Sequence, residues 1–220
     1  FLGAAFSPHS FLTATAGNTI TPNSGARWNN SVAYTSGNYS GFQAKAIYGF
    51  GEYSPGNAAS VNNGQDNIWD DGKIGVGLNY ANGPFNVDFV YQTRQHQRTD
   101  PSLATVNGES TQEWYLGGSF DLKFAKLMGS YQKQNDKNNY NNDNDVWQLG
   151  AIIPVSSAGN IHLTYAQLDW DHSQKTVALP NGINGKSKSG GVAYSHALSK
   201  RTTLYTGIVQ VKNNNDSTNI

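Results

Sequence analysis

The sequence predicts an all-β protein, and three observations lead to this fold class. Apolar and polar residues alternate along many short segments, most clearly between Asp71 and Arg94. The composition favours strands over helices, since Gly, Asn, Tyr and Thr are abundant, with 24 Gly and 12 Tyr against 1 Met. The alternating segments are joined by short turns and long loops in strict succession. A chain of 220 residues could form one large β-domain or two small ones.

The segment from Asp71 to Arg94 is predicted to be a β-hairpin with one apolar and one polar face. Apolar residues stand at alternate positions, first Ile74, Val76, Leu78 and Tyr80 and then Phe85, Val87, Phe89 and Tyr91. Successive side chains of a strand point to opposite faces, so the residues between them form a polar face. Between the two runs, Asn82-Gly83 supplies residues that tolerate the positive φ of a tight turn.

The other strands repeat this pattern. They are expected at residues 27–34, 42–50, 113–120, 125–132, 147–153, 161–165, 191–195 and 201–212. Short turns are expected at Ser36–Asn38, Asp121–Lys123, Ser156–Gly159 and Ala197–Lys200, and long loops at residues 52–71, 96–111, 134–144 and 170–186. About ten strands in five hairpins result, each roughly eight to eleven residues long. The inward and outward faces of the last strand are left open.

The arrangement of the connections narrows the fold class to a transmembrane antiparallel β-barrel. A soluble sandwich has no reason to place every long loop at the same end of consecutive hairpins, whereas a membrane barrel has short turns on one side and long loops on the other. Aromatic residues near strand ends also suit the interface girdles of such a barrel. They are Trp28, Tyr34, Tyr48, Phe50, Tyr80, Phe85, Tyr91, Trp114, Phe120, Tyr131 and Trp147. The alternative is a soluble, lectin-like sandwich in which these aromatics form the core.

Composition excludes several other classes. The formal net charge is zero, which argues against nucleic acid as the partner. Cysteine is absent, which excludes disulfides and thiolate metal sites. No apolar run reaches about 18 residues, so no membrane-spanning helix is expected. The sequence starts and stops in loop-like stretches, and we expect it to be an internal portion of a longer protein.

Four stretches resemble the general porins of the Gram-negative outer membrane, especially their β-proteobacterial branch. They are Ala26–Tyr34, Ser40–Gly51, Gly159–Ala166 and Ala197–Tyr205. The resemblance covers most of residues 26 to 212, in order along the chain.

The resemblance implies a sixteen-stranded, homotrimeric barrel in the outer membrane, in contact with the lipid bilayer and lipopolysaccharide. Residues 26–220 would supply strands six to fifteen with their external loops, and residues 1–25 the third loop, which folds inward and narrows the pore. The expected function is passive diffusion of small hydrophilic solutes and ions, with anions weakly preferred. An enzyme is not expected, since no inward face carries a Ser/His/Asp set, and Ser195 and His196 point to opposite faces.

Charged residues on the inward face are the candidate site, because charge at the narrowest point selects ions. Side-chain parity predicts that Arg27, Lys45, Lys73, Asp88, Arg94, Glu113 and Lys126 face inward, five basic against two acidic. Arg27, where the inward loop rejoins the wall, is favoured for the constriction, with Lys45 next to it. The plain alternative for each residue, and above all for Lys73, Arg94 and Lys126 near the strand ends, is a solvated wall residue.

Three acidic clusters invite a metal site, although no cofactor is expected. They are Asp70-Asp71, Asp143-Asn144-Asp145 and Asp169-Trp170-Asp171-His172. Oxygen-rich loops can hold Ca²⁺, but none of the three has the spacing and terminal Glu of an EF-hand. The five histidines are scattered without an HExxH pattern, which argues against zinc.

Overall fold

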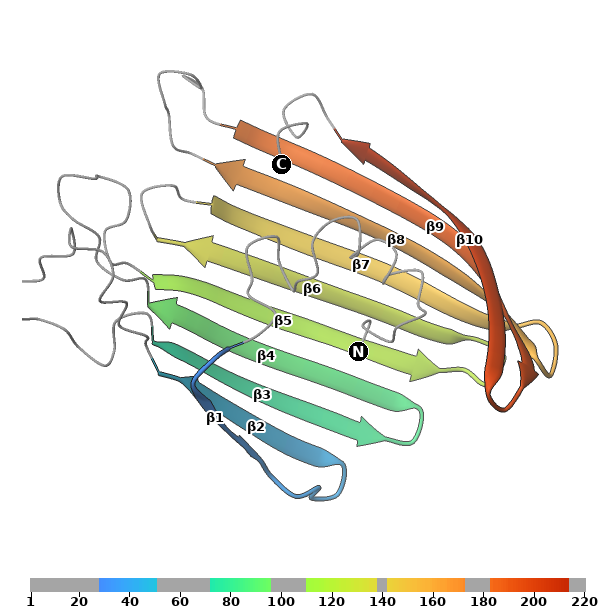
Figure 1. The fold of residues 1–220 in the computed structure, drawn as a ribbon, viewed down its shortest axis with the longest axis horizontal. Coiled ribbons are helices and arrows are strands. Elements are labelled where there is room, and N and C mark those ends of the chain that lie inside the picture. The colour runs from blue at the N-terminus through green and yellow to red at the C-terminus, as the bar shows by residue number, and fades with distance from the viewer. Residues whose placement is uncertain (1–27, 51–71, 96–109, 138–141, 173–182, 214–220) are drawn as a thin grey trace, which may run out of the picture.

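A computed structural model describes residues 28–50, 72–95, 110–137, 142–172 and 183–213. They form one sheet of ten strands in the order of the sequence (Figure 1). The strands are β1 Ser31–Thr35, β2 Phe42–Gly49, β3 Lys73–Asn82, β4 Phe85–Gln95, β5 Ser110–Asp121, β6 Lys126–Asp136, β7 Asn142–Pro154, β8 Gly159–His172, β9 Ile183–Ser199 and β10 Thr202–Asn213. Among these residues no helix has the length and apolarity of a membrane span.

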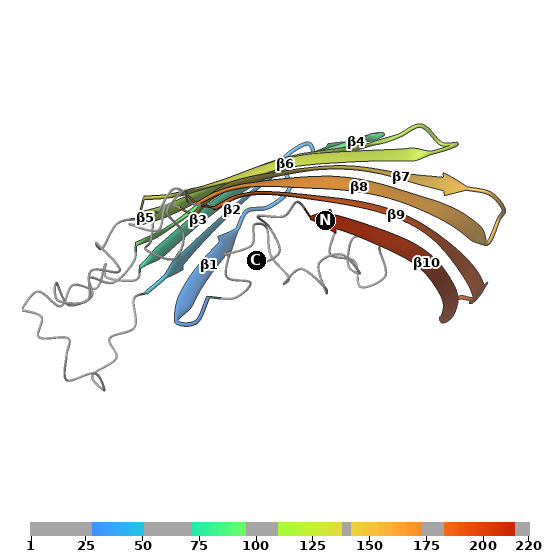
Figure 2. The same ribbon diagram turned by 90° about the horizontal axis from the view of Figure 1, so that it is seen from above.

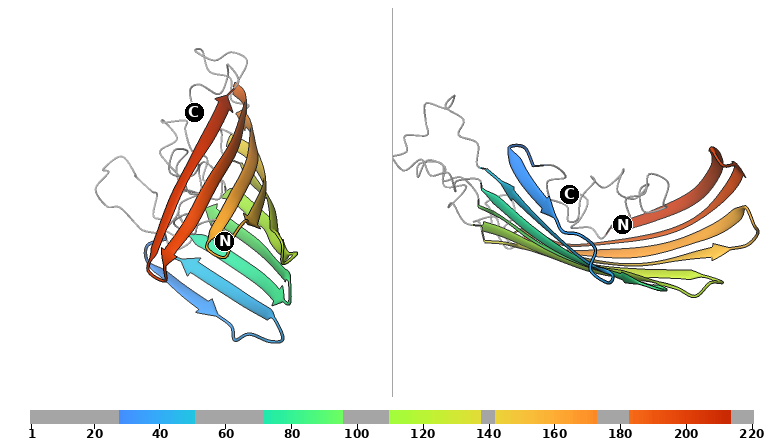
Figure 3. Two further views of the ribbon diagram at one scale, coloured as in Figure 1. Left: turned by 90° about the vertical axis from the view of Figure 1, so that its right-hand side faces the viewer. Right: turned by 90° about the horizontal axis from the view of Figure 1, so that it is seen from below.

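Every strand pairs antiparallel with its neighbours in sequence, so the sheet is a continuous meander. The sheet curves strongly across its strands and has one concave and one convex face (Figures 2 and 3). Within the described part of the chain, β1 and β10 each pair on one side only, which leaves two sheet edges. The number of strands and their antiparallel order confirm the all-β barrel prediction.

The burial of side chains is inverted relative to a soluble domain. Among the described residues Ala125 is the only buried hydrophobic side chain, whereas Gln134 is 2% exposed and Gln132 4%. Large apolar side chains are exposed instead, such as Leu78 at 59%. A water-soluble sandwich must bury its apolar face. This distribution disfavours the lectin-like alternative.

Glycines with positive φ close the hairpin turns at the ends of the first strands. Gly83 has φ 56° and is followed by Pro84, so it occupies the first central position of a two-residue turn, where type II′ turns place glycine. Asn82 itself belongs to β3, so the prediction that Asn82 shares the positive φ is wrong. The first turn lies at Ser40-Gly41, with φ 54° and 96°, beyond the predicted Ser36–Asn38.

Several strands extend beyond their predicted ends. Gln134 and Asn144, predicted to bound a solvated loop, lie in β6 and β7 and are buried. Trp170 and Lys186, predicted to bound another loop, lie in β8 and β9. The turn predicted at Ala197–Lys200 is shorter, since β9 continues to Ser199. A barrel wall can be polar on its inward face, so the missing apolar alternation did not signal the end of a strand.

Candidate functional site

The polar face of the sheet carries the candidate site. Residues paired across neighbouring strands point to the same face, so the register sorts the side chains. Concave side chains converge and cover one another while convex ones diverge, which assigns the buried polar face to the concave side. The charged residues on this face, within the described ranges, are Lys45, Lys73, Asp88, Arg94, Glu113, Asp121, Lys126 and Asp136.

The register puts all six described residues of the predicted set on one face, namely Lys45, Lys73, Asp88, Arg94, Glu113 and Lys126. It also adds Asp121 and Asp136 to the same face, so that four basic residues stand against four acidic ones in this part of the chain. The predicted ratio of five to two counted Arg27 among the basic residues and neither Asp121 nor Asp136 among the acidic ones. Arg27, favoured for the constriction, lies outside the described residues and stays a prediction, as do residues 1–25.

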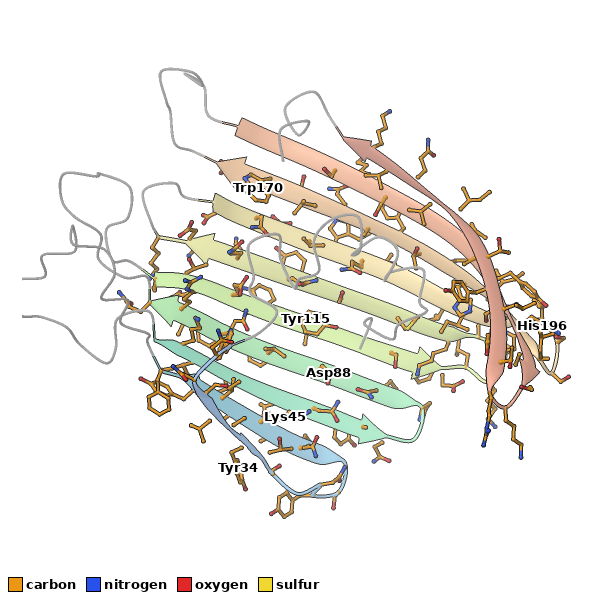
Figure 4. All side chains as sticks on the ribbon, viewed as in Figure 1. Tyr34, Lys45, Asp88, Tyr115, Trp170 and His196 are labelled. Carbon is orange, nitrogen blue, oxygen red and sulfur yellow. The ribbon has the colours of Figure 1, made fainter. Side chains whose placement is uncertain are left out.

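Four of the described candidates, Lys45, Asp88, Arg94 and Lys126, do not form one cluster. Lys45 pairs with Gly77, and Asp88 pairs with Asn79 one inward-facing position nearer the turn, so these two share the middle of the wall. Figure 4 shows Lys45 and Asp88 well inside the sheet, with Tyr115 beside Asp88. Arg94 lies six residues beyond Asp88 on β4, about 20 Å along the strand. Lys126 is the first residue of β6, next to the turn, and pairs with Asp121.

Asp88 is held by the amide of a neighbouring strand. Asn79 Nδ2 donates to Asp88 Oδ1 at 2.7 Å and also to Asn86 Oδ1 at 3.0 Å. Asp88 Oδ2 is buried and has no hydrogen-bond partner among the described residues. Asp88 Oδ1 is therefore held by the Asn79 side chain, and Asp88 Oδ2 is shielded from solvent.

Tyr115 was not identified from the sequence, and it lies against this carboxylate. Its ring folds along β5 onto Gly117, so that the phenol oxygen occupies the space that a Cβ of Gly117 would take. Gly117 pairs with Asp88 on one side and with Ser130 on the other. A glycine two residues from a tyrosine on the same strand face was the available sequence signal, because bare glycines in sheets are often covered by aromatic rings.

A row of polar side chains crosses the concave face near the loop ends of the strands. The row runs through Gln92, Glu113, Gln134, Asn144 and Trp170, each paired with the next by register. Gln92 Nε2 donates to Glu113 Oε2, and Asn144 Nδ2 donates to Gln134 Oε1. Beyond this row, Thr111 Oγ1 donates to Asp136 Oδ1 at 3.2 Å. These bonds hold the wall in a defined shape.

The concave faces of β8, β9 and β10 carry few ionisable groups in the described part of the chain. Small residues line β9, namely Ser187, Ser189, Gly191, Ala193 and Ser195. His162 Nε2 lies 2.8 Å from Ser195 Oγ, while His196 points to the convex face and bonds to Tyr194 there. Ser195 and His196 thus lie on opposite faces, as predicted.

The convex face is apolar and carries aromatic residues at two levels. Near the turns, Phe42 stacks on Tyr80 with ring centroids 4.4 Å apart, and Phe85 on Phe120 at 4.5 Å. Toward the loops, Trp114 contacts Tyr131 at 5.1 Å and Trp147 contacts Tyr165 at 5.3 Å. Exposed apolar side chains such as Leu78 and Leu116 lie between these levels. Such a band is the lipid-facing surface of a transmembrane barrel.

Charged residues follow on the convex face beyond the aromatic belt at the loop ends. Lys186 Nζ forms an ion pair with Asp169 Oδ1 at 2.8 Å across β8 and β9. Burial acts to raise the pKa of Asp169, but hydrogen bonds from Lys186 and Gln167 outweigh it and hold this pKa below its ordinary value. The pair with Asp169 raises the pKa of Lys186. Lys186 therefore stands outside the concave site.

The acidic clusters do not form a metal site in the part of the chain that the structure describes. No group of three or more His, Asp or Glu side chains there is arranged to hold an ion. Asp143 pairs with Asp171 and Asp145 with Asp169 across β7 and β8 on the convex face. The cluster at Asp70-Asp71 lies outside the described residues, so a calcium ion bound to that loop stays untested.

An open curved sheet with a polar concave wall, an apolar convex band and aromatic belts defines the wall of a transmembrane β-barrel. Residues 2–216 match the family described as Gram-negative porin, and the chain belongs to that family. It is an outer-membrane protein. The resemblance noted in the sequence is thereby confirmed.

Two curated relatives and one solved structure illustrate the likeness. Outer membrane porin protein 32 of Delftia acidovorans is 33% identical over 88% of this chain and 49% of its own length. An outer membrane porin protein of Bordetella pertussis is 26% identical over 81% of this chain and 51% of its own. The chain therefore spans about half the length of these relatives. The trimer form of OmpT of Vibrio cholerae has a TM-score of 0.61 at 11% identity, covering 84% of this chain and 55% of that one, which concerns the fold alone.

Proposed function

We propose that this chain forms part of the wall of a water-filled outer-membrane channel, through which small hydrophilic solutes and ions diffuse passively. The observation that carries the proposal is the inverted burial, with polar side chains gathered on the concave face and apolar ones exposed on the convex face. The two sheet edges among the described residues cannot face lipid unpaired, so further strands complete the barrel.

We further propose a weak anion preference. The described part of the concave face carries equal numbers of basic and acidic residues, but the two groups differ in their exposure to solvent. Lys45, Arg94 and Lys126 are exposed, whereas Glu113 is 6% exposed and Asp136 7%. Asp88 has one oxygen fixed and the other covered. Asp121 is the one exposed acidic residue of the described set, and it lies at a turn. An ion in the lumen therefore meets more accessible positive than negative charge, which raises the local anion concentration.

The partners of the channel follow from its surroundings. The charged belt around Asp169 and Lys186 lies beyond the aromatic residues at the loop ends, at the level of the lipid headgroups. We propose lipopolysaccharide as its neighbour in the outer leaflet. A homotrimer is proposed on the strength of the family and of the trimer form of the OmpT structure.

Single-channel recording of the full-length protein tests the anion preference. The zero-current potential across a planar bilayer in a KCl gradient should have the sign of an anion-selective pore. Lys45→Glu should move it toward cations, and Arg27→Glu should do so if the inward loop rejoins the wall at that residue. The shift should shrink at high salt, because the Debye length falls from about 10 Å at 0.1 M to about 3 Å at 1 M.

Lys186→Glu is the matched control, since it makes the same charge change on the convex face. It should leave the zero-current potential almost unmoved. An unshifted potential with Lys45→Glu would remove this residue from the selectivity of the pore, and the absence of any conductance from the folded full-length protein would overturn the channel itself.

A further inference from the structure

We propose that Tyr115 determines the ion selectivity of the channel by covering the carboxylate of Asp88, so that permeating ions meet Lys45 without its acidic counterpart. The proposal rests on the function proposed above, since it takes the concave face as the wall of an ion-conducting pore. Tyr115 is uncharged and attracts neither anions nor cations by itself, so it acts only by covering Asp88.

The first step is the position of the phenol ring. Gly117 offers no side chain, and the Tyr115 ring lies in the resulting gap, with its hydroxyl where the Cβ of Gly117 would stand. Residues paired across antiparallel strands have Cβ atoms about 4.5–5.5 Å apart. The hydroxyl therefore stands at about that distance from the Cβ atoms of Asp88 and Ser130, the two partners of Gly117.

The second step is the state of the two neighbours. Asp88 Oδ2 is buried and has no hydrogen-bond partner among the described residues. Ser130 Oγ is buried as well, beside the Tyr115 hydroxyl. A carboxylate oxygen lies two bonds beyond its Cβ, so the carboxylate of Asp88 can reach toward the Tyr115 hydroxyl over Gly117. Asp88 Oδ1 already accepts a hydrogen bond from Asn79 at 2.7 Å. The carboxylate is thus bounded by an amide on one side and a phenol on the other.

The third step is the residue that stays accessible. Lys45 is exposed and lies one inward-facing position further along the wall, over Gly77. Lys45 stands on β2, whereas the Tyr115 ring lies over Gly117 on β5, on the far side of Asp88. The ring can therefore cover Asp88 without covering Lys45. Removing the ring would open the carboxylate to the lumen while leaving Lys45 in place.

The physical consequence depends on ionic strength. A ring in van der Waals contact keeps an ion about 3.5–4 Å further from the carboxylate than direct contact would. At 1 M salt the Debye length is about 3 Å, so that distance weakens the screened interaction about threefold. At 0.01 M the Debye length is about 30 Å, so screening over that distance is slight and only the longer distance itself weakens the interaction. The effect of Tyr115 is therefore larger at high salt, which separates it from simple neutralisation of Asp88.

A double-mutant cycle in the full-length protein tests this. Asp88→Asn should shift the zero-current potential little in a gradient centred near 1 M when Tyr115 is present. In a Tyr115→Ala background the same change should shift it about threefold more, toward anions. Tyr115→Phe keeps the ring and should behave as the parent does. Equal Asp88→Asn shifts in the two backgrounds at high salt would overturn the proposal, whatever the absolute preference of the parent channel.

A second measurement uses Tyr115→Thr, in case Tyr115→Ala does not fold. Threonine also removes the ring but has a higher preference for β-strands than alanine. These 220 residues contain no cysteine, so Asp88→Cys introduces the first thiol in this part of the protein. A charged methanethiosulfonate reagent should modify it severalfold faster in the Tyr115→Thr channel than in the Tyr115 channel, as followed by the loss of conductance. Equal modification rates would show that the ring does not cover this position. A pore that never conducts would instead refute the channel function.

Discussion

At the scale of single residues, neighbours along one strand lie in opposite environments, with lipid around one side chain and water around the next. Val76 and Leu78 are 43% and 59% exposed on the convex face, where lipid surrounds the barrel. Gly77 lies between them on the concave face, next to Lys45 and Val90 on the neighbouring strands. A Cβ built on Gly77 makes only ordinary van der Waals contacts. One residue along the chain therefore separates a lipid position from a water position.

Arginine substitutions at these positions should separate the two faces. Val76→Arg or Leu78→Arg should cost about 2–4 kcal/mol near the bilayer midplane, because a charge enters hydrocarbon there. Gly77→Arg should cost less, since its side chain reaches a wet lumen. Urea titration of folding into lipid vesicles measures the difference. Equal unfolding free energies for the convex and concave variants would show that the faces are assigned wrongly.

At the scale of elements, the hairpin turns depend on two glycines in different surroundings. Gly83 has positive φ but nothing within 4 Å of a built Cβ, so its requirement is purely conformational. Gly41 also has positive φ, and its Cβ would stand 2.5 Å from the carbonyl oxygen of Ala81. That carbonyl belongs to β3, the strand next to the Ser40-Gly41 turn. The backbone of β3 therefore cannot easily move away from a Cβ added at Gly41.

Alanine at the two turns should therefore have unequal effects. Gly83→Ala should destabilise the protein by about 1–2 kcal/mol, the cost of a left-handed conformation with a Cβ. Gly41→Ala should destabilise it more, because backbone overlap adds to the same strain. Equilibrium unfolding of both variants in vesicles gives the comparison, with Gly37→Ala as the control, since its Cβ meets only the Tyr39 ring at 3.7 Å. A larger loss at Gly83 than at Gly41 would contradict the structure.

At the scale of the whole molecule, the convex face has to be divided between lipid and neighbouring subunits. The hairpin of β3 and β4 exposes Leu78 and carries aromatic residues of the turn-end belt, as expected for contact with lipid. The resemblance to porins implies that the main contact of the proposed trimer lies on strands outside this segment. The hairpin should therefore face the bilayer.

Cysteine cross-linking tests whether the β3–β4 hairpin faces lipid. The 220 residues of this chain contain no cysteine of their own. Leu78→Cys should not form a disulfide between protomers under oxidising conditions, because no second copy of the residue lies near it. A lipid-soluble maleimide should label the same thiol, which controls for burial. Efficient cross-linking of Leu78→Cys would place the subunit contact on β3 and remove the proposed alignment of the strands.

The sequence by itself determined the strands, their apolar faces and most of the tight connections. Alternation with a period of two is a local property, so Val76 and Leu78 could be assigned to one face without knowledge of any partner strand. The resemblance of Gly159–Ala166 and the other matching stretches to porins likewise required no structure. The ends of β6 and β7 could not be read in this way, because Gln134 and Asn144 have the polarity of a solvated loop and yet belong to a wet barrel wall.

The tertiary structure alone decided which inward residues meet. The faces of β10 followed only from its register with β9, where Ile208 opposes Val192 on the convex side. The approach of Tyr115 to Asp88 depends on the pairing of Gly117 with Asp88, which joins residues 29 positions apart in sequence. Alternation tells on which face a side chain lies, but not how far along the partner strand its neighbour stands. Register is a relation between strands, so the exposed and covered charges of the wall could be told apart only in the folded sheet.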